Sequence, residues 1–427
     1  MRDFRDSASL AHASAINLSS RVLAVCLGLA LTLYTARLGP QAQGVFAVFL
    51  AVEAVLLAAG SGFGVALARR LSHHQQHPGP WVRQMLLACM ALGVALALAL
   101  AWASRTAGES YASLAWLAWA APLMLLPGNL SGLWLGRGHM LGLAAFMLAP
   151  PALTLLGIAA VHALGMASGV AAVLTAWVVA RVAVALGSLA AAARSGYLKA
   201  QPHARTAQGL QTQAGFIAII GLTNLVSLLN YKVDVFLVER FMGLAPTGVY
   251  SIAVAVAELL WLVSSAVTTA AYARIGQPDR AAAVELTIKA MHASVGMLMA
   301  ISPLLLGAAW WLVPALLGEA YRSALPALAL LLPGVVLYGA ASALSAWFTN
   351  HAGRPQVPAL LALCSLLINI AVSLWAIPRW GLLGAALATT LSYAITMAVA
   401  VWVFSRASGC PLRRALWPWG GPKTALQ

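Results

Sequence analysis

Twelve apolar stretches, joined by short polar connections, account for most of the chain. Each stretch is about 18 to 25 residues long, which lets a helix cross a hydrocarbon core of about 30 Å. Only 8% of the 427 residues are charged and 62% are hydrophobic, whereas about 25% of residues are charged in an average soluble domain. The sequence therefore predicts an all-α integral membrane protein with about 12 transmembrane helices. We expect them near residues 13–35, 43–67, 83–104, 113–135, 141–163, 169–190, 212–237, 248–271, 286–310, 326–349, 358–377 and 383–405.

Two segments in opposite halves of the chain resemble each other. Residues 36–56 read ARLGPQAQGVFAVFLAVEAVL, and residues 239–260 read ERFMGLAPTGVYSIAVAVAELL. A shorter pair, LLPG at 125–128 and again at 331–334, lies at nearly the same spacing. Such an internal repeat is typical of transporters built from two similar lobes. The matched residues of the longer segments are Arg37 and Arg240, Gly39 and Gly243, Gly44 and Gly248, Phe46 and Tyr250, and Glu53 and Glu258.

The number of spans fixes the orientation of this repeat. Six spans per half is an even number, so both halves start on the same side of the membrane and form a parallel repeat. The longest connection, near residues 191–211, separates the halves. We therefore predict two six-helix lobes, residues 1–207 and 208–427, around a central cavity. Because the connections are too short to fold into a soluble domain, the protein acts within the membrane or at its surfaces.

The formal net charge of +15 is explained by membrane topology, without a nucleic-acid partner. With the N-terminus inside, basic residues are concentrated in the cytoplasmic connections, as the positive-inside rule requires. We therefore expect a multi-pass membrane protein with both termini in the cytoplasm and membrane lipids as partners. The outer side holds only Arg37, Arg105, Arg240, Arg322 and Arg379, and the cytoplasmic side holds Arg2, Arg5, Arg69, Arg70, Arg83, Arg137, Arg194, Lys199, Arg205, Arg274, Arg280, Lys289, Arg354, Arg406, Arg413, Arg414 and Lys423.

The sequence contains no pattern typical of a metal, disulfide or cofactor site. The four cysteines have no paired spacing. His73, His74 and His77 share one cytoplasmic loop without carboxylates or cysteines, and we interpret them as solvated. The N-terminal segment lacks a cleavable signal pattern, so we expect a retained first helix.

Most of the tryptophans lie near predicted span ends. We interpret these residues as an interfacial aromatic belt, which explains them without a bound sugar. They include Trp81, Trp116, Trp261, Trp311, Trp380 and Trp402.

Three basic residues lie away from the ends of predicted spans, namely Arg21, Arg181 and Lys232. A charge in hydrocarbon costs at least about 2.5 kcal/mol at the membrane centre, so it normally faces a cavity, a partner or a substrate. One hypothesis is a cationic cavity for a phosphate or pyrophosphate group, to which arginine donates bidentate hydrogen bonds. The alternatives are snorkelling of Arg21, neutralisation of Lys232 by Asp234, and pairing of Arg181 with a carboxylate on another helix.

Three acidic residues also lie within predicted spans, namely Glu53, Asp234 and Glu258. Glu53 and Glu258 occupy matched positions of the repeat, and neither has a lysine or arginine within one helical turn. One hypothesis assigns these carboxyl groups and Asp234 to proton coupling, because a desolvated carboxyl group can take up and release a proton as its surroundings change. The alternative is a salt bridge or hydrogen bond between helices. Asn224 and Asn230 carry the same ambiguity between substrate binding and helix packing.

Several longer motifs resemble a known family. They are ARLGPQAQGVFAVF at the end of the first span, DVFLVERFMGLAPTGVYSIAVAVAELLW at 234–261, NHAGRPQVPALLAL at 350–363 and IPRWGLLGAALATTLSYAI at 377–395. In these motifs the chain resembles the oligosaccharide (Wzx-type) flippases, polysaccharide biosynthesis proteins of the multidrug, oligosaccharidyl-lipid and polysaccharide exporter superfamily. The resemblance covers about residues 12 to 405.

This resemblance implies a non-enzymatic transporter with twelve or fourteen helices in two lobes. It would flip an undecaprenyl-pyrophosphate-linked oligosaccharide from the cytoplasmic to the periplasmic leaflet for lipopolysaccharide or exopolysaccharide assembly. It implies a cationic cavity, for which this chain offers Arg21, Arg181 and Lys232, together with an ion gradient and polysaccharide polymerase machinery as a partner. No cofactor is expected.

Three other classes were weighed. A multidrug or cation antiporter of the same superfamily would need acidic groups in its cavity, whereas basic groups are at least as numerous here. A major-facilitator transporter would have an acidic residue in the loop between spans 2 and 3, and RRLSHHQQHPGPWVRQ has none. A membrane-embedded glycan polymerase or glycosyltransferase would need a catalytic loop with acidic residues or histidines arranged for catalysis, and we identify no such loop.

Overall fold

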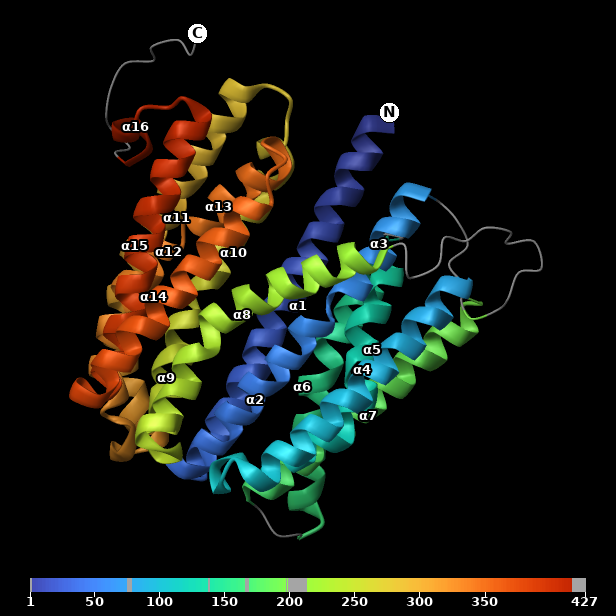
Figure 1. Cartoon of the computed structure of the whole chain (residues 1–427), viewed down its shortest axis with the longest axis vertical. Helices are drawn as coiled ribbons and strands as arrows, with labels where there is room; N and C mark the ends of the chain where they lie inside the picture. Colours follow the sequence, from blue (N-terminus) through green and yellow to red (C-terminus); the bar gives the residue numbers. More distant parts are fainter. Residues whose placement is uncertain are drawn as a thin grey trace. The chain divides into compact units, whose positions relative to one another are not determined.

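The computed structural model describes residues 2–74, 79–136, 139–165, 169–196, 198 and 213–416. Every regular element in this part of the chain is a helix, as Figure 1 shows. The described ranges contain twelve spans that are long and apolar enough to cross a membrane. The predicted all-α membrane fold is therefore confirmed. The spans are Ala15–Arg37, Pro40–Gly60, Trp81–Thr106, Leu114–Gly136, Met140–Ala163, Val170–Arg194, Ala214–Met242, Leu244–Tyr272, Arg280–Leu317, Glu319–His351, Gln356–Trp380 and Leu382–Ser408.

The chain divides into two compact units, Met1–Leu228 (unit 1) and Leu229–Gln427 (unit 2). The boundary lies within helix α8 (Ala214–Met242), so the two parts of this helix belong to different units. Our predicted lobe boundary after residue 207 lies outside the described residues, and the division into lobes 1–207 and 208–427 stays a prediction.

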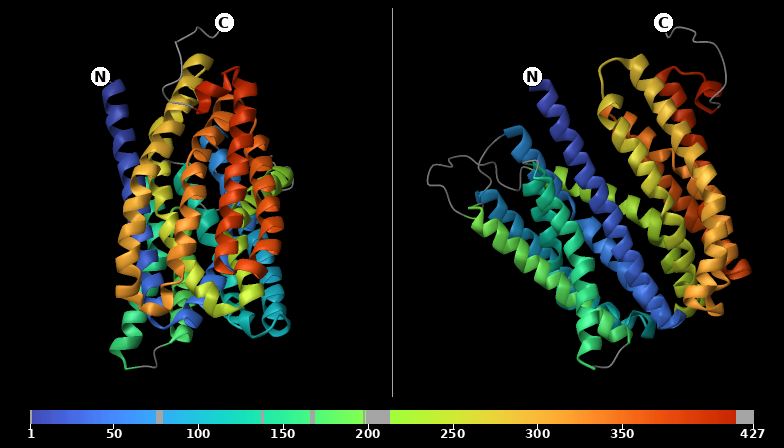
Figure 2. Two further views of the ribbon diagram at one scale, coloured as in Figure 1. Left: turned by 90° about the vertical axis from the view of Figure 1, so that its left-hand side faces the viewer. Right: turned by 180° about the vertical axis from the view of Figure 1, so that it is seen from behind.

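Unit 1 is organised around helix α5, against which α2, α3, α4, α6 and α7 all pack. Its core contains large side chains such as Phe46, Phe49 and Trp177. Figure 2 shows the helices of each unit lying side by side. The helices are α1 (Arg2–Arg37), α2 (Pro40–Gly60), α3 (Gly62–His74), α4 (Gly79–Thr106), η1 (Glu109–Tyr111, 3₁₀), α5 (Leu114–Gly136), α6 (Met140–Ala163), α7 (Val170–Arg194) and the first half of α8.

Unit 2 repeats this arrangement around helix α12. Helices α9, α11 and α15 pack against α12 as α2, α4 and α7 pack against α5, and α14 packs on α15 as α6 packs on α7. The helices are the second half of α8, α9 (Leu244–Glu258), α10 (Leu260–Ile275), α11 (Arg280–Leu317), η3 (Glu319–Tyr321, 3₁₀), α12 (Ala324–Tyr338), α13 (Ala341–Ala346), η4 (Trp347–His351, a π-helical turn), α14 (Gln356–Trp380), α15 (Leu382–Ser408) and α16 (Leu412–Leu416).

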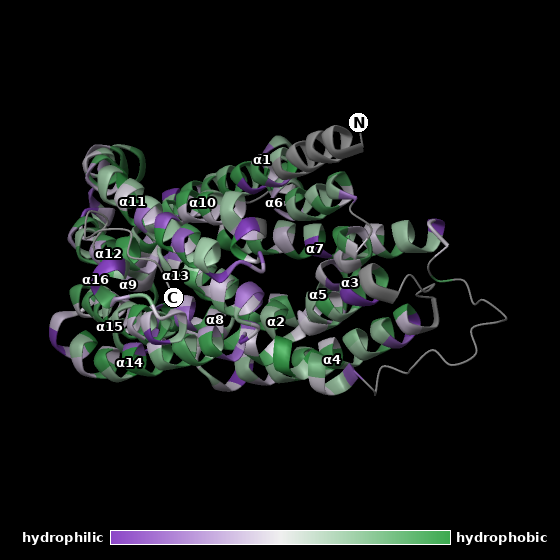
Figure 3. Ribbon diagram, turned by 90° about the horizontal axis from the view of Figure 1, so that it is seen from above, coloured by the Kyte–Doolittle hydropathy of each residue, from purple (hydrophilic) through white to green (hydrophobic). Residues whose placement is uncertain are grey.

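The outer surfaces of the helices are apolar. Large side chains such as Leu98, Trp119 and Leu304 are 68%, 81% and 73% exposed, and hydrophobic residues run along the helices in Figure 3. Such extended exposed apolar surface is disfavoured in water and is typical of contact with lipid. These features describe a multi-pass membrane protein.

The repeat extends to the turns between helices. Gly39 and Gly243 stand at the N-cap positions of α2 and α9 with φ of 107° and 83°, a backbone conformation that is costly for any other residue. Gly108 and Gly318 also have positive φ and precede the 3₁₀ turns η1 and η3. The sequences there are GESY at 108–111 and GEAY at 318–321, a matched pair that the sequence analysis missed.

The two units share one helix junction and differ at another. Ser61 separates α2 from α3 in unit 1, and Leu259 separates α9 from α10 in unit 2, and both residues keep right-handed helical dihedrals. Helix α12 ends at Tyr338 and α13 starts at Ala341, whereas its counterpart α5 runs unbroken to Gly136. A Cβ atom on Gly339, within the second junction, would lie 2.2 Å from Leu298. Glycine therefore allows a close helix approach at this junction.

Candidate functional site

Unit 1 contains an ion pair between two helices. Nη2 of Arg181 on α7 lies 2.5 Å from Oε1 of Glu53 on α2. The Arg181 guanidinium also lies over the ring of Trp177, with Cζ 4.6 Å from the ring centroid. Phe49 meets Trp177 edge-on at 4.9 Å. Both Phe49 and Glu53, and Trp177 and Arg181, are four residues apart, so each pair shares one helix face.

The two members of this unit 1 ion pair differ in exposure. The side chain of Glu53 is 4% exposed and that of Arg181 is 25% exposed. Nε of Arg181 is buried and has no hydrogen-bond partner in the described part of the chain. The carboxylate therefore holds the guanidinium in place, while a quarter of the arginine side chain stays exposed.

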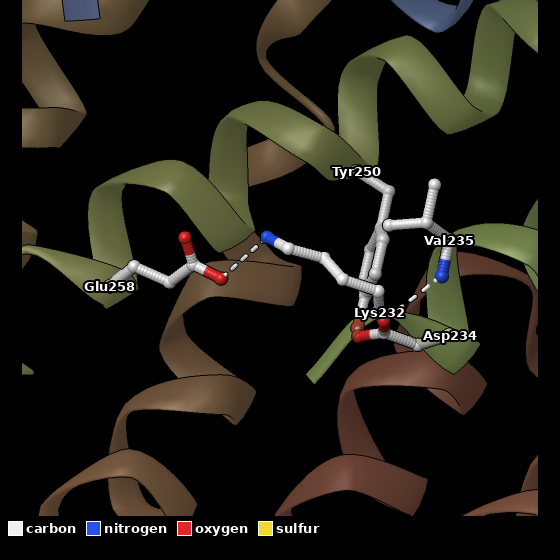
Figure 4. Close-up of polar contacts among 5 residues, drawn as sticks. All are labelled: Lys232, Asp234, Val235, Tyr250 and Glu258. Atoms are coloured by element: carbon white, nitrogen blue, oxygen red, sulfur yellow. Dashed lines mark hydrogen bonds and ion pairs between the residues drawn. The ribbon is translucent and has the colours of Figure 1, made fainter. Parts of the chain in front are cut away.

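Unit 2 contains the second ion pair, between Lys232 on α8 and Glu258 at the end of α9. Nζ of Lys232 lies 2.9 Å from Oε1 of Glu258, and the side chains are 26% and 31% exposed. Figure 4 shows the lysine side chain extended toward this carboxylate. Asp234 adds a second favourable electrostatic interaction with Lys232. In the unit 2 ion pair, one ammonium group therefore interacts with two carboxylates.

Asp234 is fixed within the packing of α8 and α9. It is buried, and its Oδ2 accepts a hydrogen bond of 2.8 Å from the hydroxyl of Tyr250. Its Oδ1 accepts a bond of 2.9 Å from the backbone N–H of Val235, as drawn in Figure 4. Tyr250 also shares a hydrogen bond with Thr389 on α15. The hydroxyl that holds Asp234 is absent at the matched position of unit 1, which is Phe46.

The remaining predicted residues make other contacts. Arg21 is exposed on α1, and its Nε donates to Oδ1 of Asn17, one turn earlier, at 2.9 Å. Asn224 donates to Oγ of Ser61, between α2 and α3, at 2.8 Å. Asn230 is buried and donates to the hydroxyl of Tyr338 at 3.4 Å. The structure thus joins Glu53 with Arg181, and Lys232 with both Glu258 and Asp234.

Two tryptophans do not fit the predicted interfacial belt. Trp81 is 1% exposed and belongs to the core of unit 1, beside residues such as Leu67 and Met85. Trp261 lies inside the span Leu244–Tyr272 and packs on Tyr231, with ring centroids 4.7 Å apart. The interpretation was wrong for both, because closeness to a predicted span end does not determine which way a side chain points.

Aromatic partners of the charges were missed as well. Trp177, Tyr231, Tyr338 and Tyr393 were not among the predicted site residues. Only the spacing of four residues between Trp177 and Arg181 could have indicated a shared face. No group of three or more histidine, cysteine or acidic side chains that could bind a metal occurs among the described residues.

Comparison with known proteins supports the fold but not one family. No protein-family model matches the chain, and no curated protein matches it in sequence. Solved structures do match. The lipid II flippase MurJ in an inward closed conformation has a TM-score of 0.73 at 14% identity, over 92% of this chain and 87% of that chain.

Two other solved structures belong to the MOP superfamily. An inward-facing multidrug resistance MATE family transporter has a TM-score of 0.69 at 17% identity, over 92% of this chain and 96% of that chain. A transporter from Pyrococcus furiosus, described as having a binding pocket of reverse polarity, has a TM-score of 0.63 at 16% identity, over 95% and 96% of the two chains. The chain therefore has the fold of MOP superfamily transporters.

Proposed function

We propose that the protein is a transporter that flips a lipid-linked oligosaccharide, carried on undecaprenyl pyrophosphate, from the cytoplasmic to the periplasmic leaflet by alternating access. The observation that carries this proposal is the state of Arg181. Its guanidinium is held in place by Glu53 and Trp177, yet a quarter of the side chain is exposed. A positioned and partly exposed guanidinium suits a pyrophosphate group.

Other residues have supporting roles in this proposal. Arg21 and Lys232 are further cations for the anionic cargo, Asn224 and Asn230 are polar contacts, and Glu53, Asp234 and Glu258 are candidates for ion coupling. We place the protein in the bacterial inner membrane with both termini cytoplasmic, next to polysaccharide polymerase machinery.

A multidrug or cation antiporter is the second candidate, favoured by the similarity to the MATE transporter fold. In such a protein a carboxylate would receive a cationic substrate. Here Glu53 and Glu258 each contact a basic side chain, and Asp234 accepts from Tyr250. A cationic substrate would have to displace Arg181 or Lys232, which makes this candidate weaker.

The proposal is tested by mass spectrometry of the lipids that the purified full-length protein retains. We expect a prenyl-pyrophosphate glycan on the wild type. The double variant with Arg181→Gln and Glu53→Gln removes both charges of the unit 1 ion pair, so it leaves no buried charge unpaired and keeps the fold. It should lose the glycan lipid. Arg322→Gln, which breaks the exposed pair with Glu319, is the control and should retain it.

Two outcomes would contradict the proposal. One is equal retention of the glycan lipid by the double variant, which would exclude Arg181 from cargo binding. The other is a wild-type protein that retains no prenyl-pyrophosphate lipid and transports organic cations in proteoliposomes, which would favour the antiporter.

A further inference from the structure

Four aromatic side chains of unit 2 gather beside the unit 2 ion pair and are called here the aromatic cluster. Tyr231 directly precedes Lys232 on α8 and packs on Trp261 with ring centroids 4.7 Å apart. It also meets Tyr338 edge-on at 6.1 Å. Tyr338 stacks on Tyr393 at 4.2 Å with an interplanar angle of 25°. The cluster thus joins α8, α10, α12 and α15.

One polar atom beside the cluster lacks a hydrogen-bond partner within the described residues. The hydroxyls of Tyr231 and Tyr338 share a hydrogen bond, and Asn230 donates to Tyr338 through Nδ2. Asn230 is only 2% exposed, but its Oδ1 has no hydrogen-bond partner in the described part of the chain. A buried polar atom without a partner costs about 1–3 kcal/mol, so its presence calls for a reason such as a ligand.

A second group of aromatic side chains in unit 2 is a buried part of the hydrophobic core and serves as a comparison. Trp347, Phe348 and Phe404 pack edge-on with centroids about 5 Å apart, as aromatic pairs do in cores. Each of the three is at most 2% exposed, and they lie within an apolar core. In contrast, three members of the aromatic cluster, Tyr231, Trp261 and Tyr338, are half-buried and adjoin charged side chains, and only Tyr393 is 2% exposed. Core formation does not explain the three half-buried rings.

The cluster lies within two membrane spans of unit 2 whose backbone stays helical beside it. Leu259, before Trp261, and Gly339, after Tyr338, both have right-handed helical dihedrals. They belong to the spans Leu244–Tyr272 and Glu319–His351. The half-buried aromatic and charged side chains of the cluster are therefore carried by membrane-spanning helices.

We infer that the aromatic cluster is a carbohydrate-binding subsite that receives one sugar ring of the cargo. The apolar C–H face of a sugar stacks on the rings of Tyr231 and Trp261, while its hydroxyls bond to the tyrosine hydroxyls, Asn230 and the unit 2 ion pair. A neutral sugar suits this site because Lys232 already neutralises Glu258. An organic cation would meet the ammonium group of Lys232. The inference rests on the proposed function and names the part of the cargo bound in unit 2.

The test is a competition between glycosylated and sugar-free carrier on the full-length protein. Lipid-linked oligosaccharides extracted from the native cells are mixed with an equal amount of undecaprenyl pyrophosphate, and both retained lipids are quantified by mass spectrometry. We expect the wild type to favour the glycosylated lipid. Trp261→Leu should lower the ratio of glycosylated to sugar-free lipid by about 3- to 10-fold, which corresponds to the loss of one aromatic stacking contact. Tyr231→Phe, which keeps the ring, should lower it less.

Trp375→Leu is the matched control, because Trp375 is half-exposed and pairs edge-on with Trp380 in the same unit. It should leave the ratio unchanged. The ratio is measured within one sample, so a lower yield of folded protein does not change it. An unchanged ratio in Trp261→Leu, or a wild type without preference for the glycosylated lipid, would overturn the subsite while leaving the flippase proposal intact. A wild type that retains neither lipid, or retains organic cations instead, would overturn both.

Discussion

The two ion pairs use the same carboxylate position of the repeat but different cations. Glu53 and Glu258 are matched in sequence. In unit 1 the cation is Arg181 on α7, whereas in unit 2 it is Lys232 on α8. Unit 1 buries the carboxylate almost completely and stacks the cation on tryptophan, while unit 2 leaves both charges partly exposed. The two units thus share their helix arrangement but differ in the cation that pairs with the matched carboxylate.

The largest effect is expected from removing each cation in turn. Arg181→Ala leaves the buried Glu53 carboxylate unpaired and should lower the free energy of unfolding by about 3–5 kcal/mol. Lys232→Ala leaves Glu258 partly exposed, so its loss should be less than half of that. Thermal unfolding of the purified proteins in one detergent measures both. Adding Glu53→Gln to Arg181→Ala should restore most of the stability.

Equal losses in the two single variants would show that the pairs are equally buried in the membrane, contrary to the difference in exposure. Failure of Glu53→Gln to restore stability would show that packing of Arg181 on Trp177, and not the unpaired carboxylate, causes the loss.

The next prediction concerns Tyr250, whose hydroxyl has no counterpart at the matched position of unit 1. Tyr250→Phe gives unit 2 the residue that unit 1 has at Phe46, and it removes the hydroxyl that donates to Asp234. A buried acceptor that loses its donor costs about 1–3 kcal/mol, so unfolding should shift by that amount. Tyr272→Phe, which removes an exposed hydroxyl that donates to Asn350, is the control and should change stability little.

If Tyr250→Phe is neutral in thermal unfolding, the hydroxyl does not hold Asp234. The carboxylate of Asp234 would then have another hydrogen-bond donor, and the Tyr250 hydroxyl would not be a functional difference between unit 2 and unit 1.

The spans and the matched carboxylates could be predicted from sequence, but their partners could not. Apolar stretches of about 20 residues are a local signal, and so is the repeated segment around Glu53 and Glu258. Arg181, in contrast, is separated from Glu53 by four intervening helices, and which helix faces touch depends on the packing of all of them. The sequence alone therefore does not decide, for each charged residue, between a salt bridge to another helix and a place in a substrate cavity.

Helix junctions and side-chain direction were equally hard to predict. The junction after Glu258 is the single residue Leu259, whose backbone stays helical, so no local signal such as proline or glycine marks it. Trp81 and Trp261 were assigned to the belt from their position along the chain, whereas the packing of neighbouring helices turns both inward. The GESY and GEAY segments at 108–111 and 318–321 are too short to identify a repeat from sequence, and their match rests on the positive φ of Gly108 and Gly318.

The last effect should be the same in both units. Gly39→Ala and Gly243→Ala place a Cβ on backbone with φ of 107° and 83°, and at neither position would the Cβ meet an atom within 4 Å. Only backbone strain remains, which costs about 1–3 kcal/mol, so the two variants should lose stability equally in thermal unfolding. Gly296→Ala, in helix α11 with open space around its Cβ, should be neutral or stabilising because alanine favours a helix. If the two glycine variants lose equal stability while Arg181→Ala and Lys232→Ala lose unequal stability, the two units share their helix geometry but differ in their ion pairs. Unequal losses at Gly39 and Gly243 would mean that the helix geometry itself differs, and the contrast between the ion pairs would then reflect backbone geometry as well as chemistry.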